Sequence, residues 1–386
     1  MSRLTVLHAA KFYPPVRGGM ETVVGDLCNG TAEQWDVRVI ASNDRPRTVE
    51  ERCGNVEVVR VAAFGSANSV PLCPSLATRL WRERADCVVL HEPNPIAGSA
   101  LFLHTPGPRL VVWHHSDLLR PWWAPYSYGL VQRALYRRAE CVIVSSPNLA
   151  ASSSLVKWAR RVVVIPFGIQ IDRYRRLDGR QRAIVSALRA ATAGPRVLFV
   201  GRFVYYKGVD GLLDAMARCA GTLLLVGDGP LEPQLRRRAI ALGIQDRVVF
   251  AGRVSDEDLP AYYHASDVFV LPSIARTETF GVVQLEAMAA GLPVVSTNLP
   301  TGVPWVNQDG VSGLVVPPGD PGRLADAIGR LLATPELRER LGRNASARAS
   351  DMFARDRMIA AFKDVVERAV LAPGLIGSRV AHADVS

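Results

Sequence analysis

Residues 196–208 read RVLFVGRFVYYKG, an apolar run followed by a glycine, a polar loop and a second glycine. The apolar run predicts a buried strand, and the residues after the second glycine have helical periodicity. Glycine allows the sharp turn that joins such a strand to its helix. A strand, a loop and a helix in this order are the repeating unit of a parallel α/β sheet.

The same unit recurs on both sides of this stretch. Apolar runs follow it at residues 222–226, 248–251, 268–271, 293–296 and 314–316, and they precede it at residues 4–8, 37–41, 56–61, 87–91, 110–114, 141–145 and 162–166. These runs are apolar throughout, which is typical of strands covered on both faces. The sequence therefore predicts two tandem doubly wound α/β domains, with the loops at the carboxyl ends of the strands facing a cleft.

A polar, arginine-rich stretch at residues 169–195 separates the two series. We predict an N-terminal domain of residues 1–172, a C-terminal domain of residues 173–372 and a tail of residues 373–386. The last helix of the second domain is amphipathic and can cross back onto the first. A chain of 386 residues agrees with two domains, because a single core rarely grows beyond about 250–300 residues.

Composition excludes several other classes of protein. The 48% hydrophobic and 21% charged content is that of a globular chain. No apolar run reaches the roughly 18 residues of a membrane-spanning helix, and the first residues lack a signal-peptide cleavage site, so we expect a cytoplasmic protein. The six cysteines include no CxxC pair, which favours free thiols over a zinc or redox site.

Positive charge is concentrated in the first half of the chain. Residues 1–180 hold 23 Lys and Arg against 15 Asp and Glu, a net +8, and the remainder holds 23 against 21, a net +2. This bias favours an anionic partner such as a lipid surface, a phosphorylated substrate or nucleic acid. The alternative is that these arginines form a solvated surface without a partner. Because no nucleic-acid-binding module is recognisable in the sequence, we expect no nucleic-acid partner.

Two of the predicted loops suit a phosphate. Gly18 and Gly19 precede a helix, whose first backbone N–H groups can approach an anion. Arg202 and Lys207 bracket the loop quoted first, and a guanidinium fork with an ammonium group suits a diphosphate. A plain turn and two solvated cations are the alternatives. Neither loop is a GxGxxG, so a dinucleotide site is not supported.

Residues 272–295, which read PSIARTETFGVVQLEAMAAGLPVV, combine two carboxylates with the start of a helix. Glu278 falls in the loop and Glu286 about two turns along the helix, so they can accept hydrogen bonds from different hydroxyls of one long ligand. Phe280 and Gly281 offer backbone N–H groups to a phosphate. The acidic triplet at residues 256–258 is better explained as a first helical turn than as a metal site, so we predict no metal ligands.

The order of these segments resembles the family-4 retaining glycosyltransferases of the GT-B architecture, in particular bacterial polysaccharide mannosyltransferases. The resemblance extends from Tyr13 to about Pro318, and it rests on the paired glycines, GRxxxxKG, GDGP and two glutamates eight residues apart within an EAMAxGxPVV context. It implies two Rossmann-like domains. It also implies a nucleotide diphosphate sugar as co-substrate, held mainly by the second domain, with no cofactor and no metal.

The resemblance assigns a role to each matching residue. Arg202 and Lys207 would bind the donor diphosphate and stabilise its leaving charge, Glu286 would accept hydrogen bonds from the ribose, and Glu278 would hold the transferred sugar. The other donor-binding positions implied are Gly18, Gly19, Arg253, Val254, Thr279, Phe280 and Gly281.

A histidine that contacts the sugar is implied as well. His115 fits the pattern aromatic-His-Ser-Asp at the end of a first-domain strand, whereas His114 belongs to the strand itself. One departure is Gln170, where the family often has an aspartate that positions the hinge.

The implied reaction is transfer of a hexose to a hydroxyl with retention of anomeric configuration. We predict mannose from GDP-mannose, with glucose from UDP-glucose as the alternative. Residues 119–138 interleave aromatic residues with arginines, which suits an anionic membrane surface and a polyprenyl-diphosphate-linked saccharide as acceptor. We therefore expect peripheral association with the inner face of the cell membrane. Rival interpretations are a buried aromatic helix at this segment, a hydrolysing nucleotide-sugar epimerase and a non-catalytic nucleotide-sugar-binding scaffold.

Overall fold

The structure is a computed structural model that describes residues 3–16, 18–67, 70–104, 107–117 and 124–371. The chain divides between Phe167 and Gly168 into two compact units. Unit 1 contains the N-terminal part of the chain and also the C-terminal segment from Arg355, and unit 2 is Gly168–Ala354.

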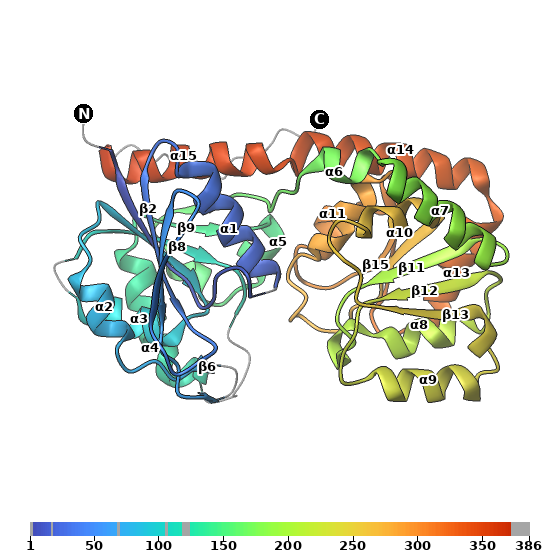
Figure 1. The fold of residues 1–386 in the computed structure, drawn as a ribbon, viewed down its shortest axis with the longest axis horizontal. Coiled ribbons are helices and arrows are strands. Elements are labelled where there is room, and N and C mark those ends of the chain that lie inside the picture. Colours follow the sequence, from blue (N-terminus) through green and yellow to red (C-terminus); the bar gives the residue numbers. More distant parts are fainter. Residues whose placement is uncertain (1–2, 17, 68–69, 105–106, 118–123, 372–386) are drawn as a thin grey trace. The chain divides into compact units, whose positions relative to one another are not determined.

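Unit 1, whose N-terminal part is drawn in blue to green in Figure 1, is built on an eight-stranded sheet of order β10-β9-β8-β7-β1-β2-β4-β3. Neighbouring strands are parallel except for β3, which is antiparallel to β4. The strands are β1 (Thr5–Ala9), β2 (Asp36–Ser42), β3 (Val49–Cys53), β4 (Val56–Val61), β7 (Cys87–Glu92), β8 (Arg109–His114), β9 (Cys141–Val144) and β10 (Val162–Val164), with a separate hairpin of β5 (Ser66–Ala67) and β6 (Val70–Pro71).

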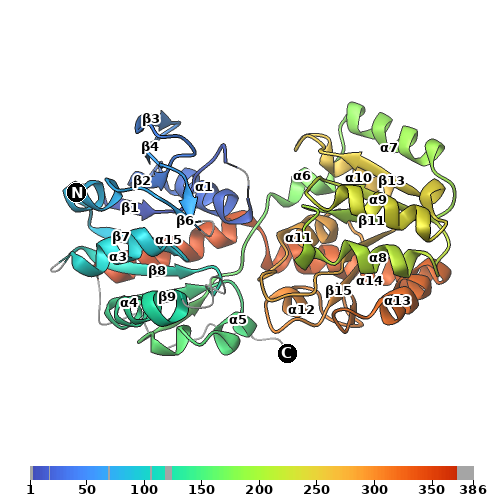
Figure 2. The same ribbon diagram turned by 90° about the horizontal axis from the view of Figure 1, so that it is seen from below.

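Helices cover both faces of the unit 1 sheet, and they are α1 (Gly19–Thr31), α2 (Leu76–Arg82), α3 (Pro95–Leu103), α4 (Ala124–Arg138), α5 (Pro147–Ser152) and α15 (Arg355–Leu371). The apolar core on one face joins residues of α2, α3 and α4 to the strands. On the other face α15 packs against α1, β7 and β8 (Figure 2). The central strands are therefore buried on both sides, as their continuous apolar sequences require.

Unit 2 contains a six-stranded, fully parallel sheet of order β13-β12-β11-β14-β15-β16. Its strands are β11 (Arg196–Val200), β12 (Thr222–Val226), β13 (Val248–Gly252), β14 (Val268–Leu271), β15 (Val294–Thr297) and β16 (Gly313–Val316). Its helices are α6 (Ile171–Arg175), α7 (Gly179–Ala191), α8 (Val209–Met216), α9 (Glu232–Ala241), α10 (Leu259–Ala265), α11 (Val282–Ala289), α12 (Val303–Val306), α13 (Pro321–Ala333) and α14 (Pro335–Met352). The helices α8, α9 and α13 share one core with the strands.

Two predictions about the organisation need correction. The first domain ends at Phe167 rather than at residue 172, and the second ends at Ala354 rather than at residue 372. The reason is α15, whose Phe362 and Val366 are buried and whose packing partners lie in unit 1, so that this helix belongs to the first unit. The predicted tail, residues 373–386, lies outside the described residues.

Candidate active site

The direction in which successive strands are added to the unit 2 sheet reverses between β11 and β14. The chain runs from β11 outward to β12 and β13, and then it returns to place β14 on the other side of β11. Loops that follow two such adjacent strands turn to opposite faces, which leaves a crevice at the carboxyl edge of the sheet where open α/β proteins bind ligands. These two loops are residues 201–208 and residues 272–281, the segments that carry most of the predicted site.

A glycine lets the two loops come together. Gly208 has φ of 65°, and a Cβ atom there would lie 2.3 Å from the carbonyl oxygen of Pro272, so the close approach excludes any larger residue. The backbone N–H of Ile274 donates to the carbonyl of Tyr206 over 2.8 Å. Together these contacts hold Lys207 beside the loop that contains Glu278.

Lys207 and Glu278 form a buried ion pair. Lys207 Nζ lies 2.5 Å from Glu278 Oε2, and the two side chains are 11% and 10% exposed. The hydroxyl of Ser273 donates to the same carboxylate oxygen over 2.9 Å. Burial alone lowers the pKa of Lys207, but the charge of Glu278 and its hydrogen bond outweigh that effect, so the pKa lies above its ordinary value. Lys207 is therefore a permanently charged ammonium group.

Arg202 is placed differently from Lys207. It is exposed on the same loop and forms no ion pair with any residue that the structure describes. Its charge interacts electrostatically with the hydroxyl of Tyr206, and the ring of Tyr206 lies 5.7 Å from Lys207 Nζ. The loop thus presents one buried cation with a counter-charge and one exposed cation, and a dianionic ligand can meet both.

Glu286 is held by two tyrosines. The Tyr263 hydroxyl donates to Glu286 Oε2 over 2.6 Å, and the hydroxyl of Tyr174 lies within hydrogen-bonding reach of the same carboxylate. Burial raises the pKa of Glu286, while both tyrosine hydrogen bonds lower it. The two tyrosine hydroxyls therefore orient the carboxylate, and its remaining lone pairs can accept from a ligand hydroxyl.

The start of α11 supplies backbone groups. Gly281 has φ of 70° at the N-cap, and a Cβ atom there would lie 2.5 Å from Leu271 Cδ2. Phe280 is buried against Trp305 and Phe353, which fixes the turn before the helix. The carbonyl of Thr279 accepts from the N–H of Gly302 over 2.8 Å.

Arg253 and Val254 lie one loop further along the edge of the sheet. The guanidinium of Arg253 donates to Asp228 Oδ2 over 2.5 Å, and both side chains are exposed. This ion pair joins the loop after β13 to the loop after β12. Val254 is half-buried beside it.

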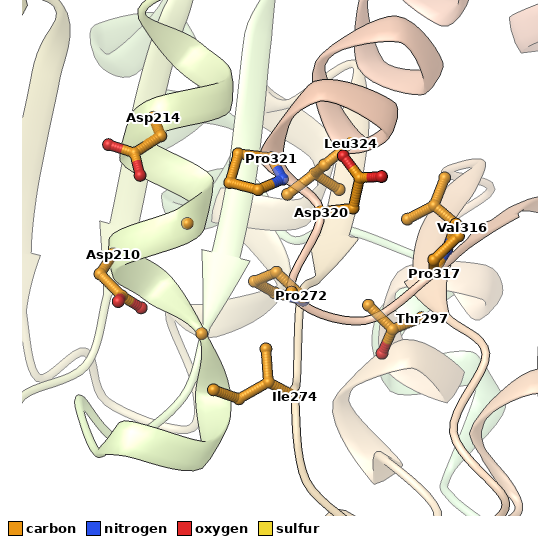
Figure 3. Close-up of a pocket in the computed structure, with 13 residues that line it drawn as sticks. Asp210, Asp214, Pro272, Ile274, Thr297, Val316, Pro317, Asp320, Pro321 and Leu324 are labelled. Atoms are coloured by element: carbon orange, nitrogen blue, oxygen red, sulfur yellow. The ribbon is translucent and has the colours of Figure 1, made fainter.

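A neighbouring groove has a different character (Figure 3). It holds about 150 Å³ between the starts of α8 and α13, and none of the predicted site residues lines it. Two of its carboxylates have structural partners: Asp214 pairs with Arg238, and Asp320 accepts from the backbone N–H of Arg323 at the start of α13. We therefore keep the candidate site at the edge formed by β11 and β14.

In unit 1 the paired glycines stand at the start of α1. Gly18 is the N-cap residue and Gly19 the first helical residue, with open space where its Cβ would be. The loop before them is anchored by Arg60, which donates to the carbonyls of Tyr13 and Pro14 and to Glu51.

His115 follows β8 directly and is 4% exposed. Its ring lies against both Trp113 and Phe167, at centroid distances of 5.8 and 5.6 Å, and these two rings also contact each other at 6.3 Å. His114 is the last residue of β8 and pairs with the Tyr136 hydroxyl over 2.8 Å, which agrees with its predicted place in the strand. Burial lowers the pKa of His115 to about 3, so its imidazole is neutral.

The sequence interpretation missed the supporting residues. Tyr263, Tyr174 and Arg60 lie outside the motifs, and only the folded chain brings them to the site. Tyr206 lies inside the GRxxxxKG motif, at one of its unspecified positions. Only Tyr206 carried a local signal, because it stands between the two predicted cations.

Two Rossmann-like units with parallel sheets are the architecture of the GT-B glycosyltransferases. The solved structure of sucrose-phosphate synthase from Thermosynechococcus elongatus has this architecture, and it matches with a TM-score of 0.80 and 25% identity over 95% of this chain and 99% of that chain. The sequence confirms the class: residues 18–168 match the glycosyl transferase 4-like domain, and residues 181–348 match the glycosyl transferases group 1.

The chain belongs to this glycosyltransferase family. The O-antigen chain mannosyltransferase C of Escherichia coli is 33% identical over 93% of this chain and 97% of that protein. The D-rhamnosyltransferase WbpZ of Pseudomonas aeruginosa is 32% identical over 91% and 92%. The predicted family, GT-B fold and transferase activity are confirmed. Among the described residues, no helix has the length and apolar character needed to span a bilayer.

Proposed function

We propose that this glycosyltransferase moves a hexose from a nucleotide diphosphate sugar to a hydroxyl of a lipid-linked saccharide in cell-surface polysaccharide synthesis. The observation that carries the proposal is the pair of cations at the β11–β14 crevice, one buried with Glu278 and one exposed. As the bond between the sugar C1 and the phosphate oxygen breaks, the leaving diphosphate gains negative charge. Cations already placed there stabilise that charge without reorganisation.

Retention is the stereochemical course we propose. The acceptor oxygen attacks C1 from the face that the diphosphate leaves, and the acceptor proton passes to the departing phosphate oxygen. Glu278 Oε2 already accepts from Lys207 and Ser273, which supports a positioning role for this carboxylate rather than a nucleophilic one. Arg202 and Lys207 supply the positive charge, so we propose that no metal is required.

For the donor we propose GDP-mannose. Mannosyl transfer is in the name of the Escherichia coli relative, whereas the Pseudomonas aeruginosa relative is named for rhamnosyl transfer, so the similarity alone leaves the sugar open. Glu286 would accept from the ribose, and the backbones of Arg253 and Val254 would face the base. His115, Gly18 and Gly19 would contribute contacts to the sugar and phosphate from unit 1.

The deciding experiment compares donors directly. GDP-mannose and UDP-glucose are titrated against the protein by calorimetry, and release of nucleotide diphosphate is then followed with and without a polyprenyl-diphosphate saccharide. We expect tighter binding of GDP-mannose, turnover that depends on the acceptor, and unchanged turnover in EDTA. Equal turnover without acceptor would indicate a hydrolysing epimerase, and binding without any turnover would indicate a scaffold.

A further inference from the structure

Three histidines from neighbouring strands form a hydrogen-bonded row in unit 1. His8 lies on β1, His91 on β7, and His115 directly after β8. His8 Nδ1 lies 3.0 Å from His91 Nε2, and His91 Nδ1 lies 3.0 Å from His115 Nε2. Adjacent rings are nearly parallel, at interplanar angles of 16° and 25°, and their centroids lie 5.3 Å apart in both pairs, as expected for rings joined edge to edge.

The register of the sheet produces this row. His8 pairs with Val89, two residues before His91, and His91 pairs with Trp113, two residues before His115. Residues two apart on a strand share a face of the sheet, so the three imidazoles climb diagonally along one face toward its carboxyl edge. The helix α15 covers this face, with the ring of Phe362 at 5.7 Å from those of His8 and Trp113.

The surroundings keep all three rings neutral. His8 and His91 are completely buried and His115 is nearly so. Burial lowers the pKa of His8 and of His115 to about 3, and burial together with the two neighbouring imidazoles lowers the pKa of His91 well below its ordinary value. Each ring therefore carries a single proton at neutral pH.

Counting protons couples the two ends of the row. Each of the two N–H···N bonds needs one proton, and each neutral ring has only one. The third proton must then lie at one end, on His8 Nε2 or on His115 Nδ1. Both bonds are satisfied only if the three rings adopt the same tautomer, all protonated on Nε2 or all on Nδ1. The tautomer of His115 is thus set by rings as far away as His8.

We propose that His91 and His8 are positioning residues that hold His115 in the tautomer shared by the whole row, so that its Nδ1 presents one hydrogen-bonding character to the donor sugar. The two ends of the row, His115 Nδ1 and His8 Nε2, are both buried and have no hydrogen-bond partner among the described residues. Of the two, only the His115 end lies at the carboxyl edge of the sheet, where α/β proteins bind ligands. The contact with the sugar rests on the proposed function, whereas the shared tautomer does not. Groups that fix a histidine tautomer from behind are known to support metal ligands and general bases in this way.

The first test needs no donor. Long-range proton–nitrogen NMR spectra of the full chain with labelled histidine report the tautomer of each ring. We expect His8, His91 and His115 to share one neutral tautomer, and His115 to lose its single tautomer in His91→Phe, which keeps an aromatic ring but removes both hydrogen bonds. His104→Phe, a half-buried histidine outside the row, is the matched control and should leave the three signals unchanged. Different tautomers within the wild-type row would overturn the proposal, and this measurement stands even if the variant does not fold.

The second test is kinetic and uses release of GDP from GDP-mannose. We expect His91→Phe to lower kcat about tenfold, in the range seen for residues that orient a histidine from behind, with little change in KM. His91→Phe added to His115→Phe should cost nothing further, because both act through the same ring. Independent, multiplicative losses would contradict a positioning role. If the wild-type protein does not use GDP-mannose, the proposed donor is wrong, and the NMR result still decides the tautomer.

Discussion

The carboxyl edges of the two sheets present polar groups of opposite character. In unit 2 a buried ammonium keeps its charge because Glu278 lies 2.5 Å away, and an exposed guanidinium stands on the same loop. In unit 1 three buried imidazoles are bonded to no carboxylate in the part of the chain that the structure describes, and they remain neutral. Burial removes charge from a titratable group unless a counter-charge is bonded to it.

This difference separates two tasks in the proposed reaction. Stabilisation of the leaving diphosphate needs permanent positive charge. Of the cations and imidazoles compared above, only Arg202 and Lys207 of unit 2 carry it. Recognition of neutral sugar hydroxyls needs fixed hydrogen bonds without charge, which the unit 1 edge supplies through His115. The following variants test this division.

The largest expected effect is on turnover at Lys207. Lys207→Ala should lower kcat for nucleotide release by about 10²–10³, by analogy with the loss of one oxyanion-stabilising donor. Arg237→Ala removes an exposed cation from α9 in the same unit and serves as the control. Steady-state assays on both variants decide the point, and near-normal turnover of Lys207→Ala would remove the basis of the proposed function.

Stability should separate the two cations of the loop. Lys207→Met leaves the Glu278 carboxylate buried without its partner, which should cost about 3 kcal/mol of unfolding free energy. Arg202→Met changes an exposed side chain and should stay within about 0.5 kcal/mol of wild type. Urea unfolding followed by circular dichroism measures both. Equal losses would mean that the ion pair is no more tightly held than a surface contact.

Features that are local in the sequence could be predicted before the fold was known. Every predicted strand is present, and its ends lie within two residues of those expected. The prediction succeeds because a strand buried on both faces has a continuous apolar sequence. The loops with Arg202, Lys207 and Glu278 follow the predicted strands directly. The edge strand β3 was missed because its sequence, Val-Glu-Glu-Arg-Cys, is mostly polar and exposed.

Features that depend on register or long-range packing could not be predicted. His8 and His91 are simply the ends of two apolar runs in the sequence, and only the parallel alignment of β1, β7 and β8 brings them to His115. The Tyr263 contact with Glu286 joins α10 to α11 and depends on how these two helices pack. That the last helix can cross back onto the first domain was expected from its amphipathic sequence, but such a pattern does not identify the surface that the helix covers.

We expect exposed arginines of unit 1, but not those of unit 2, to contribute to binding of an anionic membrane surface. Of the predicted lipid-facing segment, residues 119–138, residues 119–123 lie outside the described residues, and Tyr128 is buried with its hydroxyl donating to Glu92. Arg133 and Arg137 are exposed on α4, with Arg137 4.2 Å from the Trp158 ring. If they face lipid headgroups, replacing both by Ala should weaken binding to anionic vesicles by about 2 kcal/mol, or about 30-fold.

The matched control for this vesicle experiment lies in unit 2. Arg236 and Arg237 on α9 are also exposed, and Arg236 lies 4.1 Å from the Phe250 ring. Replacing both removes the same charge and the same kind of ring contact. Sedimentation with phosphatidylglycerol vesicles should distinguish the two pairs. Equal weakening would indicate attraction through net charge alone, and no binding by the wild-type protein at low salt would refute membrane association.

The smallest effect is expected at Glu286, where the hydrogen bond from Tyr263 lowers the carboxyl pKa against the effect of burial. Tyr263→Phe removes that bond, so the pKa should rise further and the carboxylate should become protonated at a higher pH. Because the ionised form is the better acceptor for ribose hydroxyls, donor affinity should fall about tenfold, equivalent to about 1.4 kcal/mol. The acid limb of its pH profile should move to higher pH, while kcat at saturating donor stays close to wild type.

Tyr262→Phe, at the adjacent half-buried tyrosine, is the control. A loss of affinity that is the same at every pH would show that Tyr263 acts through packing and not through the ionisation of Glu286.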